Sequence, residues 1–293
     1  MSMSMTRPAG DADVHVSFRL AAGIGLGAGL LGGLFGVGGG LIIVPSLLAF
    51  ASMDRRRAHG TSLGSTLLIG LASLVTYLAH GNVDWAVAAF LAVGSVVGAV
   101  IGTTLLHVVS KRVLVYVFVG TVLVTALRLF TTTESNGVER LTPWTAALMV
   151  VVGLVAGVLA GLLGIGGGVI MVPAVVMVLG LPPAVAKGTS AAVIVPTALI
   201  GTIRNRTNKN ADIRVAVIVG LFGAVTAVIG ALISDRLSDA TANVLFALLL
   251  IAVAITQLMT LRFREHTGQD ATVTPGEPPL VPANAEPAAR IEP

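Results

Sequence analysis

The chain contains no cysteine among its 293 residues, which excludes disulfide bonds, thiol catalysis and metal sites built on thiolates. Charge is also scarce: charged residues make up 11% of the sequence, against roughly a quarter in ordinary soluble domains. Two stretches, 20–53 and 141–186, carry no charged residue, and each is longer than the roughly 20 apolar residues that one bilayer crossing needs. These absences predict an all-α membrane protein that crosses the bilayer several times.

The residues that are abundant agree with this prediction. The sequence is 55% hydrophobic, and its mean hydropathy is +0.94. The net charge of +4 comes largely from cations in short loops between apolar runs, where they orient a membrane protein and do not indicate nucleic-acid binding. No catalytic triad spacing, HExxH motif or carboxylate pair lies inside an apolar run, and nothing near His80 or His107 completes a metal site. We therefore expect that the protein is not an enzyme and that it binds neither a cofactor nor a metal ion.

A glycine-rich motif occurs twice. The run Gly33–Pro45 returns without a gap as Gly161–Pro173, 128 residues later, and 13 of the 30 positions from 33 to 62 are identical in the second copy. The match includes an Ala-Xaa-Gly-Thr-Ser segment that ends both copies. The chain therefore consists of two repeats, and we expect these divisions: an N-terminal tail at 1–16, the first repeat at 17–131, a linker at 132–143, the second repeat at 144–262, and a disordered cytoplasmic tail at 263–293, which is rich in Pro, Ala and Glu.

Each repeat begins with a long apolar stretch that its glycines interrupt, because glycine costs about 1 kcal/mol relative to alanine in a helix interior. The apolar piece beyond each break has about twelve residues, enough for only half a bilayer. Three full spans should follow the broken stretch in each repeat: 60–79, 85–106 and 113–130 in the first, and 188–203, 215–233 and 240–261 in the second.

The charges of the loops predict how the repeats are oriented. Arg55, Arg56 and Arg57 form a basic loop in the first repeat, whereas the equivalent loop of the second carries one cation. The next loop is slightly acidic in the first repeat and strongly basic in the second, and the alternation continues along the chain. Under the positive-inside rule, the two repeats are inserted in opposite directions, so each broken stretch enters and leaves on one side as a helical hairpin. The alternative is that both repeats run parallel.

Paired half-helices in inverted repeats place their N-termini near the midplane, facing a substrate. The half-helices that start near Leu41 and Val169 would aim unpaired N–H groups and positive dipole ends at one centre, which predicts an anion site there. The glycines expected to allow close approach of the backbone are Gly36, Gly38, Gly39, Gly40, Gly164, Gly166, Gly167 and Gly168. The alternative role for these glycines is close packing of helices.

Other repeated residues flank this centre. Pro45 and Pro173 fall early in the half-helices, where a missing N–H has little effect. The hydroxyls that open the next spans either cap a helix or donate to an anion, and they belong to Thr61, Ser62, Thr189 and Ser190. Lys187 is the only charged residue between 141 and 203, so it either attracts the anion or extends to the lipid headgroups.

The doubled Gly-Xaa-Gly-Gly-Gly motif, followed by an apolar stretch with proline and by Ala-Xaa-Gly-Thr-Ser, resembles the TauE/SafE family of sulfite exporters over about residues 20–262. The resemblance implies a permease of the bacterial or archaeal inner membrane that moves small anions, namely sulfite, sulfonates or other organosulfur and organic acid anions. The glycine motifs of the family match here at the motif glycines of both repeats.

We thus expect a secondary transporter whose partners are a small anion and the lipid bilayer, with protons or sodium as candidate coupling ions. An anion channel or a membrane scaffold that transports nothing is the alternative. The sequence does not reveal the oligomeric state.

Overall fold

The computed structural model describes residues 16–105, 116, 119, 120, 123, 127, 141–208 and 210–266, and these form α-helices and connecting loops without a strand. Most of the predicted span at 113–130, most of the linker and most of both tails lie outside the described residues. The helices of the first repeat are α1 (Phe18–Phe35), α2 (Gly40–Phe50), α3 (Arg55–Ala79) and α4 (Trp85–Leu105). Those of the second are α6 (Pro143–Leu163), α7 (Gly168–Leu179), α8 (Pro183–Thr207), α9 (Ile213–Arg236) and α10 (Asp239–His266).

The predicted breaks are confirmed in both repeats. The helix α1 ends at Gly36, which adopts a left-handed conformation with φ of 66°, and α2 begins only after Gly39, where φ is 77°. In the second repeat Gly164 and Gly167 have φ of 69° and 79°. Because side chains with a Cβ rarely adopt such angles, these glycines end one helix and allow the chain to turn into the next.

Six of the described helices are long and apolar enough to cross a membrane. The half-helices α2 and α7, with 11 and 12 residues, are too short for a full crossing. This part of the chain is therefore the polytopic helical protein that the composition predicts.

Several predicted boundaries were wrong by about one turn. The Asp54 side chain accepts a hydrogen bond from the Arg56 amide at 3.1 Å and starts α3 five residues early, so the arginine triplet belongs to the helix. Lys187 likewise lies inside α8 and not in a loop, and α10 extends past 262 into the segment predicted as tail.

The predicted position of the two prolines was also wrong. Pro45 is the sixth residue of α2 and Pro173 the sixth of α7, beyond the first turn in which a missing N–H has little effect. Each proline therefore removes one internal i→i−4 hydrogen bond from its half-helix.

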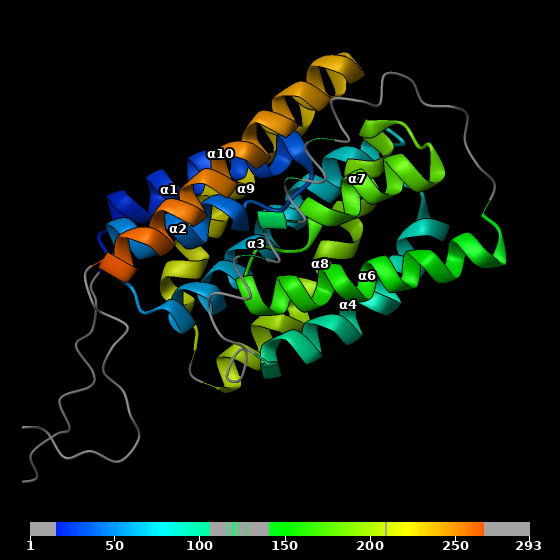
Figure 1. The fold of residues 1–293 in the computed structure, drawn as a ribbon. Helices are drawn as coiled ribbons and strands as arrows, with labels where there is room; N and C mark the ends of the chain where they lie inside the picture. The colour runs from blue at the N-terminus through cyan, green and yellow to red at the C-terminus, as the bar shows by residue number, and fades with distance from the viewer. Residues whose placement is uncertain are drawn as a thin grey trace, which may run out of the picture.

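Helices pack mainly between the repeats. Figure 1 shows α4 beside α6, and α1 packs on α9 in the same way. Glycines allow this approach: a Cβ on Gly29 would collide with the backbone of Gly223, and one on Gly157 would collide with the backbone of Ser95. These two contacts are equivalent under the 128-residue shift, so the repeats are related by an approximate two-fold axis.

The two helices nearest this axis run in opposite directions. Gly64 of α3 lies against Thr202 of α8, whereas Gly70, further along α3, lies against Ile194, which comes earlier in α8. Because α3 and α8 are equivalent in the repeat, their antiparallel packing is the geometry that an inverted pair requires.

Most of the described arginines of α3, α8 and α9 lie at one end of the bundle. Arg57 and Asp212 approach to 3.9 Å, which brings the starts of α3 and α9 together. We call this the basic end, and it carries Arg55, Arg56, Arg57, Arg204, Arg206 and Arg214. At the opposite end the Asn82 side chain donates to Asp235 at 2.7 Å.

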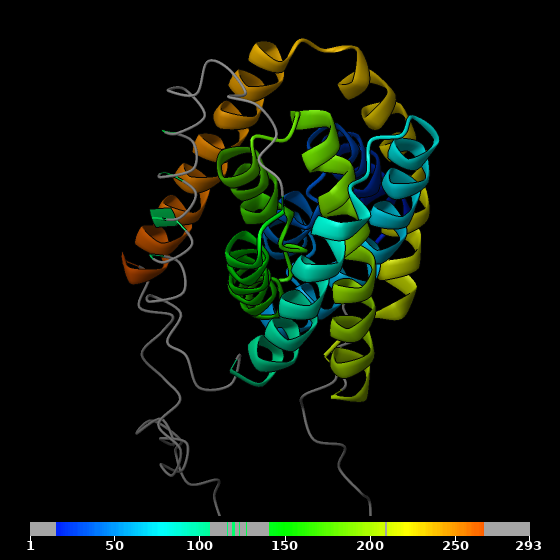
Figure 2. The ribbon, with the colours of Figure 1, turned by 90° about the vertical axis from the view of Figure 1, so that its right-hand side faces the viewer.

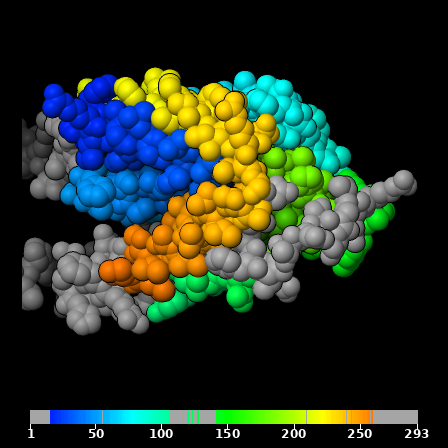
Figure 3. Space-filling view, turned by 90° about the horizontal axis from the view of Figure 1, so that it is seen from above, coloured from blue at the N-terminus to red at the C-terminus, as the bar shows by residue number. Residues whose placement is uncertain are grey.

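The last helix lies outside these pairs. Figures 1 and 2 show α10 running along the outside of the bundle, and in Figure 3 its orange surface lies between the blue surface of α1 and α2 and the green surface of the start of the second repeat. Phe246 of α10 stacks on Phe35 at the end of α1, with ring centroids 5.2 Å apart.

Inverted insertion in the cell stays a prediction, which single cysteines can test because the chain has none of its own. His80 and Asn208 are exposed equivalent residues that end α3 and α8. An impermeant maleimide applied to whole cells should label His80→Cys and Pro182→Cys from outside. Arg56→Cys and Asn208→Cys, at the basic end, should be labelled only after the membrane is opened. Labelling of positions 80 and 208 from the same side would show parallel repeats.

Candidate functional site

The two glycine loops, residues 36–40 and 164–168, meet near the pseudo-two-fold axis. A Cβ on Gly40 would lie 2.5 Å from the Gly164 carbonyl oxygen, and a Cβ on Gly168 would lie 2.5 Å from that of Gly36. Backbone therefore contacts backbone between the repeats, a distance that only glycine permits at these two positions.

Two equivalent serines hold the loops. Ser62 Oγ donates to the Gly164 carbonyl at 2.8 Å, and Ser190 Oγ donates to the Gly36 carbonyl at 3.0 Å. All four residues are buried, and each serine binds the loop of the other repeat. Since a hydroxyl has one proton, these two donate to the protein in this arrangement and have none left for an anion.

The neighbouring threonines link helix starts. Thr61 Oγ1 accepts the Asp212 amide at 2.9 Å, and Thr189 Oγ1 accepts the Asp84 amide at 3.0 Å. Neither bond caps the threonine's own helix, because both residues lie inside α3 and α8. The aspartates in turn accept backbone amides at the starts of α9 and α4. The repeated Thr-Ser pair thus connects each repeat to the other.

The half-helices begin at this centre without a side-chain cap. Gly39 and Gly167 occupy the N-cap positions of α2 and α7, and neither start receives a capping hydrogen bond from a side chain. The first N–H groups of a helix have no partner within it, and the helix dipole places partial positive charge there. Two such ends, buried in the protein, can bind negative charge.

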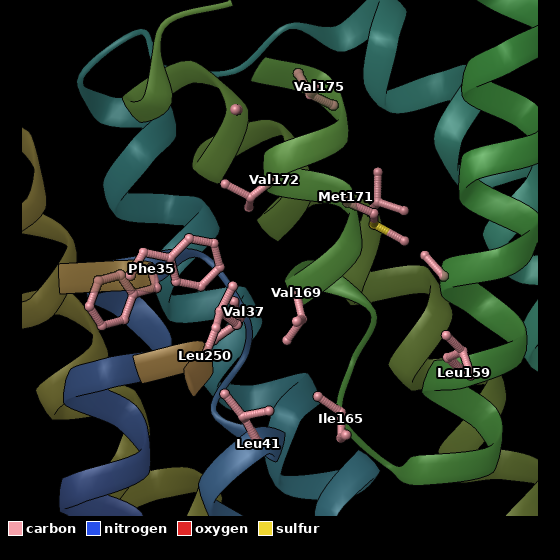
Figure 4. Packing of buried hydrophobic residues seen from close by; sticks show 14 of the residues in the cluster. Phe35, Val37, Leu41, Leu159, Ile165, Val169, Met171, Val172, Val175 and Leu250 are labelled. Carbon is pink, nitrogen blue, oxygen red and sulfur yellow. The ribbon is translucent and has the colours of Figure 1, made fainter. Parts of the chain in front are cut away.

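Aliphatic side chains surround the loops. Figure 4 shows Val37 and Leu41 facing Ile165 and Val169, each pair from one repeat. This setting excludes water and strengthens the interaction of a bound anion with backbone dipoles.

The predicted cation, Lys187, is buried beside one of the two loops. Lys187 is 2% exposed, and its Nζ donates to Ser234 Oγ at 2.8 Å, so it points into the protein and not toward headgroups. Gly36, the first residue of the loop, would place a Cβ 2.8 Å from the Lys187 backbone. His59, its equivalent, adjoins Gly164 in the same way.

The sequence analysis did not identify one residue that lies near the loops. Thr66 of α3 is fully buried, and its Cγ2 would lie 2.7 Å from a Cβ on Gly38 and 2.8 Å from one on Gly166. Its equivalent in the second repeat is Ile194, which adjoins the same two glycines. Aligning the repeats places this hydroxyl opposite an aliphatic side chain, but the alignment alone does not indicate contact with the loops.

No group of His, Asp or Glu that could hold a metal ion occurs within the described ranges. In the described part of the chain, the hydrogen-bond donors at the centre are the backbone N–H groups of the half-helix starts and threonine hydroxyls.

The fold and this centre define a multi-pass membrane protein with paired half-helices. The family model described as "Sulfite exporter TauE/SafE" matches residues 1–129 and 149–285. The chain belongs to this family, whose name and relatives are those of membrane transporters and not of enzymes.

Relatives occur in bacteria and archaea. A Bacillus subtilis protein named "Probable membrane transporter protein YunE" is 29% identical over 212 residues, covering 64% of this chain and 78% of the relative. A "Probable membrane transporter protein" of Xylella fastidiosa is 29% identical over 244 residues, covering 79% and 90%. One from Methanocaldococcus jannaschii is 26% identical over 162 residues, covering 53% and 60%. No solved structure matches the chain.

We predict that Ser62→Ala and Ser190→Ala each lower the free energy of unfolding by about 1–3 kcal/mol, because each leaves a buried carbonyl without its partner. Ser73→Ala is the matched control, since the equally buried Ser73 donates within its own helix to the Ile69 carbonyl. Thermal unfolding of the purified protein in detergent measures the difference. Equal melting temperatures for Ser62→Ala and Ser73→Ala would contradict a role of the serines in holding the loops.

Proposed function

We propose that the protein is a secondary transporter of small anions, which bind between the N-termini of α2 and α7. The observation that carries this proposal is the meeting of two uncapped helix starts in a buried centre near the pseudo-two-fold axis. Oriented backbone N–H groups bind an anion without placing a charged side chain in the membrane interior.

The donor set favours a compact oxyanion of low charge. The described arginines of α3, α8 and α9 lie in the first or last turns of their helices, for example Arg57 in α3, Arg204 in α8 and Arg236 in α9, and none is among the nearest neighbours of a loop glycine. A phosphate ester with several charges would require an arginine cluster at the centre. Sulfite, which the family description names, and small sulfonates or carboxylates match neutral donors better.

Contact between the loops favours a carrier over a channel. Gly40 and Gly168 touch the backbone of the opposite loop, so an anion passes only if the loops separate. A transporter that alternates between two such states saturates and exchanges substrate across the membrane, whereas an open channel does neither. Protons and sodium stay the candidate coupling ions.

Proteoliposomes loaded with sulfite, methanesulfonate or acetate test this function. We expect saturable uptake and counterflow of at least one of these anions. Transport of a cation or a neutral solute, with none of the three anions carried, would contradict the proposal. Flux that rises linearly with concentration would favour the channel.

Glycine substitutions test the position of the site. Gly39→Val and Gly167→Val should abolish transport, because valine is strained at φ of 77° and 79° and would obstruct the helix start. Gly27→Val is the control: this exposed glycine of α1 has nothing within 4 Å of an added Cβ. Uptake rates are normalised to the amount of protein in the membrane. If both loop variants insert normally and transport at the wild-type rate, the loops are not the site.

Lys187 tests whether a cation contributes. We expect Lys187→Gln to weaken the apparent affinity for the transported anion by about 1 kcal/mol or more, the scale of a charge-assisted hydrogen bond. Ser234→Ala serves as the control, because it removes the hydroxyl to which the ammonium donates and keeps the charge of the lysine. An unchanged half-saturation concentration in Lys187→Gln would assign the lysine a structural role only.

A further inference from the structure

Thr66 differs from the other hydroxyl residues of its helix. It is fully buried, yet its Oγ1 has no hydrogen-bond partner in the described part of the chain. Ser65, Ser73 and Thr76 of α3 each donate to the carbonyl four residues earlier, at 3.2, 2.9 and 3.0 Å. A buried hydroxyl without a partner lowers stability, so a group that the described chain does not supply, a water molecule or a ligand, would stabilise Thr66.

The position of Thr66 supplies the second observation. Its methyl carbon, Cγ2, lies between the two glycine loops, 2.7 Å from an added Cβ at Gly38 and 2.8 Å from one at Gly166. These glycines directly precede the N-caps of α2 and α7. Oγ1 branches from the same Cβ as this methyl group, so a rotation of about 120° about χ1 brings the hydroxyl to face both loops, at the centre where we place the anion.

We infer that Thr66 is a substrate-binding residue, whose hydroxyl donates to the anion held by the starts of α2 and α7. This inference rests on the proposed function and adds a ligand to the same site. The anion supplies the acceptor that the protein lacks around Oγ1. Since Ile194 holds the equivalent position, the two repeats contribute unequally: one offers a hydroxyl and the other an aliphatic side chain.

The pseudo-two-fold relation provides a specific test. Thr66→Val replaces the hydroxyl by a methyl group of similar size, and Thr66→Ser keeps the donor. In the double variant Thr66→Ile with Ile194→Thr, the hydroxyl moves to the equivalent position and the overall side-chain composition is unchanged. Thr202→Val is the control, because Thr202 Oγ1 already donates to the Ala198 carbonyl at 2.6 Å.

Each variant is assayed in proteoliposomes for uptake of sulfite, methanesulfonate and acetate, and its melting temperature is measured without anion. For the anion that the wild type carries, Thr66→Val should raise the half-saturation concentration about tenfold, which equals about 1.4 kcal/mol. Its melting temperature should not fall, because an unpartnered hydroxyl has been removed. Thr66→Ser and Thr202→Val should stay close to wild type, and the double variant should have a lower half-saturation concentration than Thr66→Val because it keeps one hydroxyl at the centre.

The outcomes separate this inference from the proposed function. If Thr66→Val keeps the wild-type half-saturation concentration while Gly39→Val is inactive, the loop site stands and Thr66 is not a ligand. A loss of uptake that accompanies a lower melting temperature would also overturn the inference, since it would indicate a structural role. If the wild type carries none of the three anions, both proposals fail.

Discussion

Contact of backbone with backbone between the two glycine loops is the constraint on which the rest of the structure depends. Irregular chain at membrane depth is tolerated only where protein covers its polar groups. Here each loop covers the other, because Gly40 and Gly168 leave room for the opposite carbonyl. Ser62 and Ser190 then satisfy those carbonyls across the repeats. Neither repeat can complete this arrangement alone, which accounts for helix pairs such as α1 with α9 and α4 with α6.

The broken helices were predictable because their cause is local: consecutive glycines such as Gly38 and Gly39 adopt positive φ without strain. The starts of α3 and α8 were not predicted correctly. The Asp54 cap extends α3, and a proline at the first position extends α8, each by about one turn beyond the predicted start. The environment of Thr66 could not be predicted from the sequence either, because it depends on the loops of both repeats meeting beside α3. Such contacts depend on packing between distant segments and leave no periodic pattern in the sequence.

The two repeats have equivalent backbones around the loops but different side chains at equivalent positions. Lys187 adjoins Gly36, whereas its equivalent His59 adjoins Gly164. Thr66 and Ile194 differ in the same manner at the centre. The backbone of the repeats keeps the two half-helices in equivalent positions, whereas the side chains beside each half-helix differ. This combination suits a carrier, which must present one site to two sides of a membrane and bind one asymmetric ligand.

Amide hydrogen exchange of the two loops tests the central claim most directly, because it reports on the proposed ligands themselves. It is measured on the purified protein with sulfite and with chloride at equal ionic strength, and repeated with methanesulfonate. Binding between the half-helices predicts slower exchange at residues 38–41 and 166–169 together, with little change in α4 and α6. Slower exchange only in peptides away from both loops, for an anion that the protein transports, would contradict the account.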